Sequence, residues 1–303
     1  LMVMSGPLTG TMAPAMRGCI VTKSPLTHTF LDSYFGGFFA PEMKYAGYDG
    51  IIVTGKSEAP CYLRIEDGEV RIEPAEHLWG LDALETNEAI KAERADSSLA
   101  ALSIGQAGEN LVRFGLVSCE YNRQAGRGGA GAVMGSKNLK AVAARGSGKV
   151  TVRDPAAFHK AVLSARAELD ASEDIQALID SGTANAIGFA NETGLLPNRN
   201  FADGTYEEAD RIDETAQSKH LWLKSAACQG CPIRCSKIGA VRTGRYAGLI
   251  TDIVEYESAA LIGSNLGISD IRAVAHLVKL CDRLGLDSMS TGGVIGFAME
   301  AAQ

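Results

Sequence analysis

The chain has 303 residues and a net charge of −7, with 46% hydrophobic and 21% charged residues. This is the composition of an ordinary globular protein that is long enough for two domains. The acidic balance argues against nucleic acid as a partner, because neutralising phosphates requires a basic surface. No apolar run approaches the roughly 20 residues that a membrane span needs, so we expect no membrane partner.

The first 148 residues favour β-structure. Residues 61–65 and 70–72 alternate in polarity on either side of an Asp67-Gly68 turn, which is the pattern of a hairpin. Further apolar runs that predict strands lie at residues 51–54, 101–104 and 141–144, and residues 83–95 predict a helix. We therefore expect a β-rich N-terminal domain over residues 1–148, incomplete at its start because Leu1 opens directly into a loop-like stretch.

The character of the chain changes near residues 146–148. Asp154 followed by Pro155 predicts a helix N-terminus, and Ser172 predicts the start of another helix. Ser269 is expected to cap a helix with one apolar face, which Gly285 then ends. Residues 200–219 are polar and predict a loop. We expect a mainly helical domain over residues 149–303, which ends in an unfinished helix, and so an α+β fold class.

Three of the seven cysteines lie within eight residues, as Cys228, Cys231 and Cys235. This C-x2-C-x3-C spacing lets several thiolates reach one small metal group from a single loop. An iron–sulfur cluster is the favoured interpretation, although a cluster usually takes four thiolates. Zinc and three unrelated buried cysteines remain the alternatives. The nearest further cysteine, Cys281, fits the apolar face of its helix better. Clustered rather than spread cysteines favour a reduced, cytoplasmic protein.

The first half contains three glycine-rich segments. They span residues 6–11, 35–38 and 124–131. Backbone N–H groups in such loops can hold phosphate, and Arg127 is suited to pair with it. Glycine also makes ordinary tight turns, and none of the three segments is a Walker loop. Together they raise an anionic cofactor as a hypothesis.

Many short segments of this chain resemble the aldehyde:ferredoxin oxidoreductase family, in the same order. The resemblance is carried by residues 6–11, 23–27, 46–50, 104–110, 125–129, 134–140, 196–201, the cysteine cluster and 282–288. This resemblance implies a β-rich domain that cradles a tungsten (or molybdenum) bis-pterin, followed by helical domains. It also implies oxidation of an aldehyde to a carboxylic acid, ferredoxin as electron acceptor, and a homodimer.

The resemblance assigns cofactor contacts residue by residue. Cys228, Cys231 and Cys235 match three ligands of a [4Fe–4S] cluster, and the fourth family ligand belongs to a later segment. The D-x-x-G-L-type pterin motif is matched by Asp282, Gly285, Leu286 and Asp287. The contacts to pterin phosphates and to a bridging Mg²⁺ are matched by Gly36, Gly37, Ala125, Gly126 and Arg127. Tyr34 stands where the family has an asparagine ligand to Mg²⁺, which puts that contact in doubt.

Glu257 matches the family's active-site glutamate, with Glu255 as the second choice. Its implied role is to orient water or to carry a proton as the aldehyde carbon is attacked. As isolated residues, glutamates at a helix start are more often simply solvated. Two other functions remain open: a tungsten-dependent reductive subunit that acts on aromatic acyl-CoA, and an iron–sulfur or zinc electron-transfer module without pterin.

Overall fold

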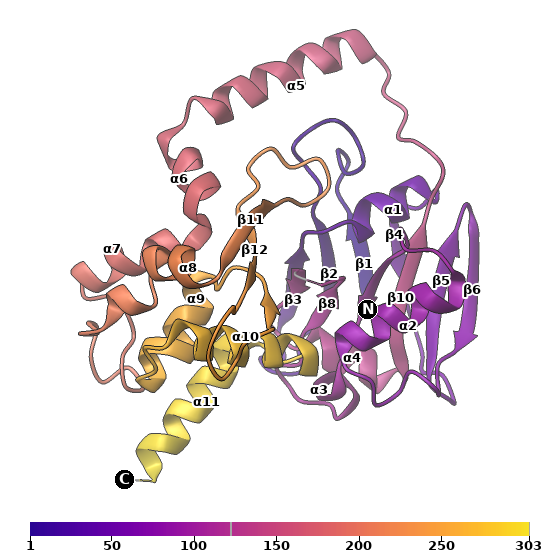
Figure 1. The fold of residues 1–303 in the computed structure, drawn as a ribbon. Helices are drawn as coiled ribbons and strands as arrows, with labels where there is room; N and C mark the ends of the chain where they lie inside the picture. Colours follow the sequence, from indigo (N-terminus) through magenta and orange to yellow (C-terminus); the bar gives the residue numbers. More distant parts are fainter. Residues whose placement is uncertain (122, 303) are drawn as a thin grey trace. The chain divides into compact units, whose positions relative to one another are not determined.

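The computed structural model describes residues 1–121 and 123–302, which form two compact units (Figure 1). The first unit comprises residues 1–166 together with two short segments from later in the chain, 228–232 and 282–287. The second unit comprises residues 167–227, 233–281 and the chain from residue 288 onward. Both later segments of the first unit carry predicted cofactor contacts.

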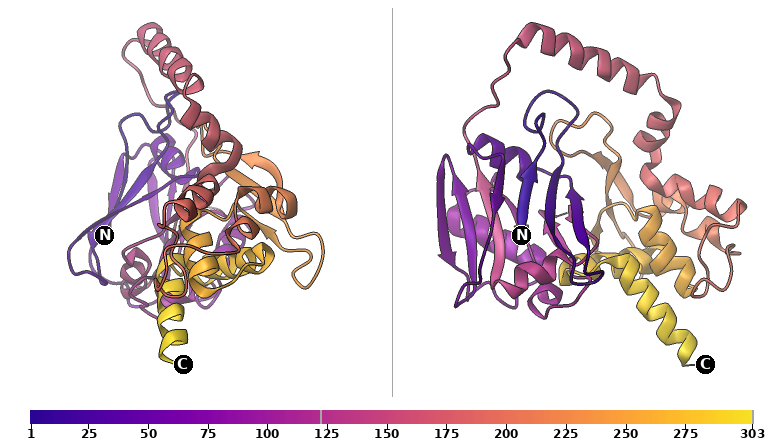
Figure 2. Two further views of the ribbon diagram at one scale, coloured as in Figure 1. Left: turned by 90° about the vertical axis from the view of Figure 1, so that its left-hand side faces the viewer. Right: turned by 180° about the vertical axis from the view of Figure 1, so that it is seen from behind.

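Two sheets build the first unit (Figure 2). The first is antiparallel in the order β3-β2-β1-β4, and the second has the order β6-β5-β10-β7-β8-β9, with β10 parallel to β5. The first sheet consists of β1 (Met2–Ser5), β2 (Gly18–Lys23), β3 (Phe30–Phe35) and β4 (Gly50–Ile52). The second consists of β5 (Cys61–Glu66), β6 (Glu69–Pro74), β7 (Ala100–Ser103), β8 (Val117–Cys119), β9 (Arg123–Ala125) and β10 (Leu139–Arg145).

The central strands β5, β7 and β10 of the second sheet are buried on both faces, and successive side chains along each strand point to opposite faces. Leu63, Leu102 and Val142 point into a core that also contains residues of the first sheet and of helix α1 (Phe39–Tyr45). Their chain neighbours Tyr62 and Ala141 point into a second core, which α2 (Ala83–Arg94) covers with Ile90. This double burial explains why β7 and β10 read as continuous apolar runs.

Helix α2 begins at a capping box. Asp82 accepts hydrogen bonds from the N–H groups of Leu84 and Glu85, both at 2.8 Å, and Glu85 returns a bond to the Asp82 N–H. The other helices of this part of the chain are α3 (Gln106–Glu109), α4 (Ala130–Ser136) and α5 (Pro155–Asp170). Asp154 caps α5 through the Ala157 N–H at 3.0 Å, as the sequence predicts.

The second unit combines helices with a small antiparallel sheet in the order β11-β12-β13. Its strands are β11 (Trp222–Ala226), β12 (Ser236–Ala240) and β13 (Ile250–Thr251). Its α-helices are α6 (Glu173–Ser181), α7 (Ala186–Glu192), α8 (Glu214–His220), α9 (Tyr256–Ser258), α10 (Ile271–Leu284, whose last turn belongs to the first unit) and α11 (Ser288–Ala301). Shorter turns are η1 (Gly182–Asn185), η2 (Ala209–Arg211), the π-helical η3 (Ala259–Gly263) and η4 (Ser264–Leu266).

The α+β fold class is confirmed, and three local predictions need correction. Residues 214–220 form α8 rather than a loop, because Asp213 caps its first turn at the Ala216 N–H. Helix α10 is capped by the Asp270 carboxylate, which accepts from the Arg272 N–H, and not by Ser269. The three strands of the second unit were not expected in a mainly helical half. Among the described residues, no helix combines the length and apolar character needed to cross a bilayer.

Candidate functional site

The cysteine loop begins within the first unit. The Cys231 N–H donates to the Cys228 carbonyl at 3.1 Å, and Gly230 between them has a φ of +68°. Cys235 follows in the segment that leads into β12 of the second unit. All three cysteines lie outside disulfides and are partly exposed. Across residues 1–121 and 123–302, no three His, Cys, Asp or Glu side chains are already arranged to hold a metal ion. The ligand assignment therefore stays a prediction.

One predicted phosphate turn lies directly against this loop. A Cβ on Gly36 would stand 2.6 Å from the Cys228 Sγ, so any larger residue here would force this thiol to move. The Gly37 carbonyl accepts the Gln229 N–H at 3.2 Å, and Gly37 has a φ of +89°, which favours glycine. The Gly36-Gly37 turn and the cysteine loop, far apart in the sequence, are thus joined by backbone contacts.

Residues 282–287, the predicted pterin motif, are held in the first unit by backbone hydrogen bonds. The Leu116 N–H donates to the Gly285 carbonyl at 2.8 Å, and the Asp287 N–H donates to the Phe114 carbonyl at 3.2 Å. A Cβ on Gly105 would lie 2.4 Å from the Leu284 carbonyl oxygen. Residues 282–287 therefore form a fixed part of the first unit, held mainly by main-chain groups.

The two carboxylates of the motif meet the glycine-rich segment 124–131. The Gln124 side chain donates to Asp282 at 3.0 Å, and Arg127 Nε lies 3.3 Å from Asp287 Oδ2. The Asp287 side chain is 5% exposed, whereas that of Arg127 is 63% exposed. Arg127 therefore keeps most of its guanidinium accessible to an anion. Among the described residues, no atom would lie within 4 Å of a Cβ on Gly126, which leaves open space beside this backbone.

Ala125 and Tyr34 lie at two other positions where cofactor contacts are expected. Ala125 is fully buried, so any contact to a phosphate there would come from the backbone. Tyr34 is 55% exposed and its hydroxyl is hydrogen-bonded to Asp32, which raises the Tyr34 pKa. This tyrosine offers no carbonyl side chain of the kind that Mg²⁺ binds, so its departure from the family pattern stands.

The two candidate catalytic glutamates belong to the second unit. Glu255 accepts a hydrogen bond from the Thr183 hydroxyl, which also accepts the Tyr256 N–H at 3.0 Å. Glu257 is exposed on the short helix α9, directly before the π-helical turn η3. Turns of this rare kind often occur at functional sites. Glu255 is thus held in place by its neighbours, while the Glu257 carboxylate faces solvent.

Cys119 and Glu120 also contact the Gly36–Phe38 turn, and the sequence alone does not indicate this. Cys119 is fully buried and donates its thiol to the Gly36 carbonyl at 3.2 Å. Burial and the neighbouring Glu120 hold the pKa of this thiol well above its usual value. Burial also raises the pKa of Glu120 to about 7. Neither residue has a local sequence signal, because their partners lie some 80 positions earlier in the chain.

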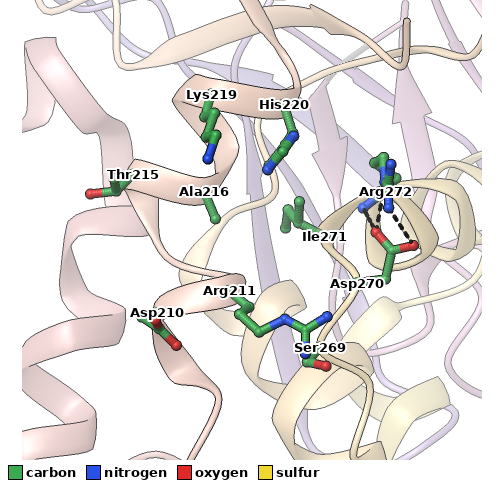
Figure 3. Close-up of a pocket in the computed structure, with 10 residues that line it drawn as sticks. All are labelled: Asp210, Arg211, Thr215, Ala216, Lys219, His220, Ser269, Asp270, Ile271 and Arg272. Carbon is green, nitrogen blue, oxygen red and sulfur yellow. Dashed lines mark hydrogen bonds and ion pairs between the residues drawn. The ribbon is translucent and has the colours of Figure 1, made fainter. Parts of the chain in front are cut away.

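A separate pocket of about 290 Å³ lies within the second unit, between α8, η2 and the start of α10 (Figure 3). Lys219 and His220 line one wall, and Arg211 lies beside Ser269 on the other. Arg272 is paired with Asp270 at 2.9 Å, and Arg211 is paired with Glu208. Because its cations are largely balanced by carboxylates, and because it contains none of the predicted site residues, we assign no function to this pocket.

The first unit thus contains the Gly36-Gly37 turn, the Arg127 loop and the first part of the cysteine loop, residues 228–232. These are segments in which the sequence predicts contacts to an anionic organic cofactor and to a metal group. The model of the aldehyde ferredoxin oxidoreductase N-terminal domain matches residues 1–146, and that of domains 2 and 3 of the same enzymes matches residues 160–303. The chain belongs to the aldehyde ferredoxin oxidoreductase family.

Individual relatives agree with this assignment. The tungsten-containing aldehyde ferredoxin oxidoreductase of Pyrococcus furiosus is 42% identical over 99% of this chain and 49% of its own length. The WOR-like subunit of an aliphatic sulfonate oxidoreductase from the same organism is 35% identical over 100% of the chain and 50% of its own length. The solved BamBC active-site complex of benzoyl-coenzyme A reductase, bound to 1,5-dienoyl-CoA, has a TM-score of 0.83 and 29% identity over 99% of this chain and 47% of its own. The chain spans about half the length of the relatives it matches.

Proposed function

We propose that the protein oxidises an aldehyde to a carboxylic acid at a tungsten bis-pterin centre and passes electrons through a [4Fe–4S] cluster to ferredoxin. The observation that carries this proposal is the contact of the Gly36-Gly37 turn with the Cys228 loop. Electrons move efficiently only over short distances. A pterin cradle that contacts the cluster loop through one turn therefore suits electron transfer from tungsten to the cluster. The tungsten-containing relatives supply the identity of the metal.

The residues present fit an anionic pterin. Arg127 keeps an accessible guanidinium, and the backbone around Gly126 borders open space, which suits a bound phosphate. Gln124 and Arg127 orient the carboxylates of Asp282 and Asp287, which supports a role for them in accepting hydrogen bonds from pterin N–H groups. We assign Asp282, Gly285, Leu286 and Asp287 to this contact. Gly36, Gly37, Ala125, Gly126 and Arg127 are assigned to the phosphates and their Mg²⁺.

The cysteine loop fits a cluster through its chemistry. Cys228, Cys231 and Cys235 offer three thiols without disulfides, and each is partly exposed. Thiolates in such spacing are the ordinary ligands of iron–sulfur clusters, and a fourth ligand completes the set. When bound, the pterin-held tungsten supplies two-electron chemistry, while the cluster accepts electrons one at a time.

Glu257 is our candidate for proton transfer. Its carboxylate is exposed, whereas Glu255 already accepts a hydrogen bond from Thr183. A general base must reach its proton within hydrogen-bond distance, so a carboxylate that is not engaged by the protein is better suited. In this proposal Glu257 takes the proton of the attacking water, and Glu255 orients the start of α9.

A direct test is aldehyde-dependent reduction of a viologen dye by the anaerobically purified protein. We expect activity that Glu257→Gln lowers by roughly 100-fold or more, the usual contribution of a general base. Glu255→Gln is the matched control, with a smaller expected loss. Equal activity of Glu257→Gln and the unchanged protein would remove Glu257 from the mechanism.

The BamBC similarity supports a second candidate function. That complex is described as the active site of a benzoyl-coenzyme A reductase and contains a dienoyl-CoA. A reductive subunit of this type would act on an aromatic acyl-CoA thioester in place of an aldehyde. Dye reduction that depends on a dienoyl-CoA, with none on a panel of aldehydes, would favour this alternative over aldehyde oxidation.

A further inference from the structure

Glu120 has a backbone conformation that non-glycine residues seldom adopt. It follows strand β8 with a φ of +58°, and it is 8% exposed. A left-handed conformation at a buried charged residue costs free energy and persists only where the surroundings enforce it. Here the Glu120 carbonyl accepts the Asn87 side-chain N–H at 2.9 Å and the Ser118 hydroxyl at 3.2 Å. These two bonds lock the strained residue in place.

In this conformation the Glu120 carboxylate points toward the glycine turn. Its two oxygens lie 3.1 and 3.2 Å from the Phe38 N–H. The preceding residue, Cys119, donates its thiol to the Gly36 carbonyl at 3.2 Å. Two consecutive side chains therefore hold both ends of the turn Gly36–Phe38.

The other side of the same turn faces the cysteine loop. The Gln229 N–H donates to the Gly37 carbonyl at 3.2 Å, and Gly36 approaches the Cys228 Sγ so closely that a Cβ there would stand 2.6 Å away. The turn is thus fixed from one side by Cys119 and Glu120 and supports the cysteine loop on its other side.

The charged groups around Glu120 are compatible with a positioning role for its side chain. The charge of Lys91 in α2 favours the ionised form of Glu120, and Arg123 packs against Gly36. Desolvation nevertheless raises the Glu120 pKa to about 7. In either protonation state an oxygen remains to accept the Phe38 N–H.

We propose that Cys119 and Glu120 form a positioning clamp for the Gly36–Phe38 turn, and through it for the cysteine loop. The clamp itself rests on contacts within the first unit. Its consequence for a cluster rests on the proposed function, because only then does the cysteine loop hold iron. Neither residue is a ligand or a catalytic group in this proposal.

Hydrogen exchange of the Gln229 amide, in the complete protein without metals, tests the clamp. We expect Glu120→Ala and Cys119→Ala each to speed this exchange by about tenfold or more, since the turn that accepts the bond loses one support. Glu120→Gln keeps an acceptor for the Phe38 N–H and should stay near the unchanged protein. The matched control is Glu88→Ala, which removes a nearby exposed carboxylate that bonds Tyr121 and not the turn.

Unchanged Gln229 exchange in both Glu120→Ala and Cys119→Ala, or equal acceleration in Glu88→Ala, would overturn the clamp. A second readout is the midpoint potential of the cluster, followed by electron paramagnetic resonance in the metal-loaded protein. A shift in Glu120→Ala that Glu120→Gln largely lacks supports the clamp, and identical potentials in all variants overturn its role toward the cluster. If the unchanged protein binds no iron, the proposed function fails, while the exchange result still decides the clamp.

Discussion

Arg283 donates a hydrogen bond to Asp82, the residue that caps the N-terminus of α2, 201 positions earlier in the chain. The same guanidinium lies 3.1 Å from Glu85, the second member of the capping box. Arg283 stands between Asp282 and Gly285, so the motif assigned to pterin is tied to the first turn of α2. The pair joins a buried carboxylate, 5% exposed, to an arginine that is 49% exposed.

Replacing Arg283 by Gln should therefore have a small effect on stability and a larger one on cofactor retention. We expect the free energy of unfolding to fall by about 0.5–1 kcal/mol, because the arginine is half exposed. Urea denaturation measures this loss, and pterin content after dialysis measures retention. Arg71→Gln, which breaks an exposed pair with Glu69, is the control and should change neither. Full retention in Arg283→Gln would refute this positioning role.

Lys140 of β10 makes a buried ion pair with Glu109 of α3. Its side chain is 0% exposed and that of Glu109 is 6% exposed, and Lys140 also donates to the Leu81 carbonyl at 2.8 Å. Lys140→Met leaves an uncompensated buried carboxylate, which should cost about 3–5 kcal/mol by chemical denaturation. The double variant Lys140→Met/Glu109→Gln removes that charge and should recover much of the loss. A cost below about 1 kcal/mol for the single variant would contradict this account.

Gly105 should not tolerate even a methyl group. Its Cβ would stand 2.4 Å from the Leu284 carbonyl oxygen, which is backbone and cannot move aside cheaply. We expect Gly105→Ala to destabilise the protein by about 1–3 kcal/mol and to loosen residues 282–287. Gly293→Ala is the matched control, because nothing lies within 4 Å of its Cβ and it sits inside α11. Equal thermal midpoints of the two variants would show that the close approach is not required.

Glu120 should make stability depend on pH. Its pKa is raised from 4.5 to about 7 by burial, so the folded state binds the proton more tightly than the unfolded state. The stabilising contribution is complete below about pH 4.5 and is lost as the pH rises through about 7. Glu120→Gln should flatten the fall in urea midpoint between pH 5 and pH 8. A slope unchanged by this substitution would mean that another group titrates.

The sequence predicted the elements that local rules control. The hairpin β5–β6, the capping of α5 by Asp154 and the end of α10 at Gly285 follow from turn chemistry and apolar period, and all are confirmed. Helices α1 and α4 were missed because tertiary burial, and not helix propensity, holds such short seven-residue segments. The sheet of the second unit was missed because its strands are short and only weakly alternating.

Part of the candidate site could also be predicted from the sequence, and part could not. Cys228, the Gly36-Gly37 turn and Asp282 were visible as motifs, and the fold brings the segments that contain them into the first unit. The contacts that Gln124, Glu120 and Asp82 make could not be predicted, because each joins residues at least 80 positions apart in the sequence. Only pairing of distant strands and loops creates these contacts.

The most direct test of the account is metal analysis with electron paramagnetic resonance on the complete, anaerobically purified protein. We predict about four iron atoms per chain together with about one tungsten, and a reduced cluster signal. Cys231→Ser should abolish that signal, whereas Cys61→Ser, at a buried cysteine in β5, should leave it intact. Zinc without iron or tungsten, or a signal unchanged in Cys231→Ser, would contradict the proposed tungsten centre and [4Fe–4S] cluster.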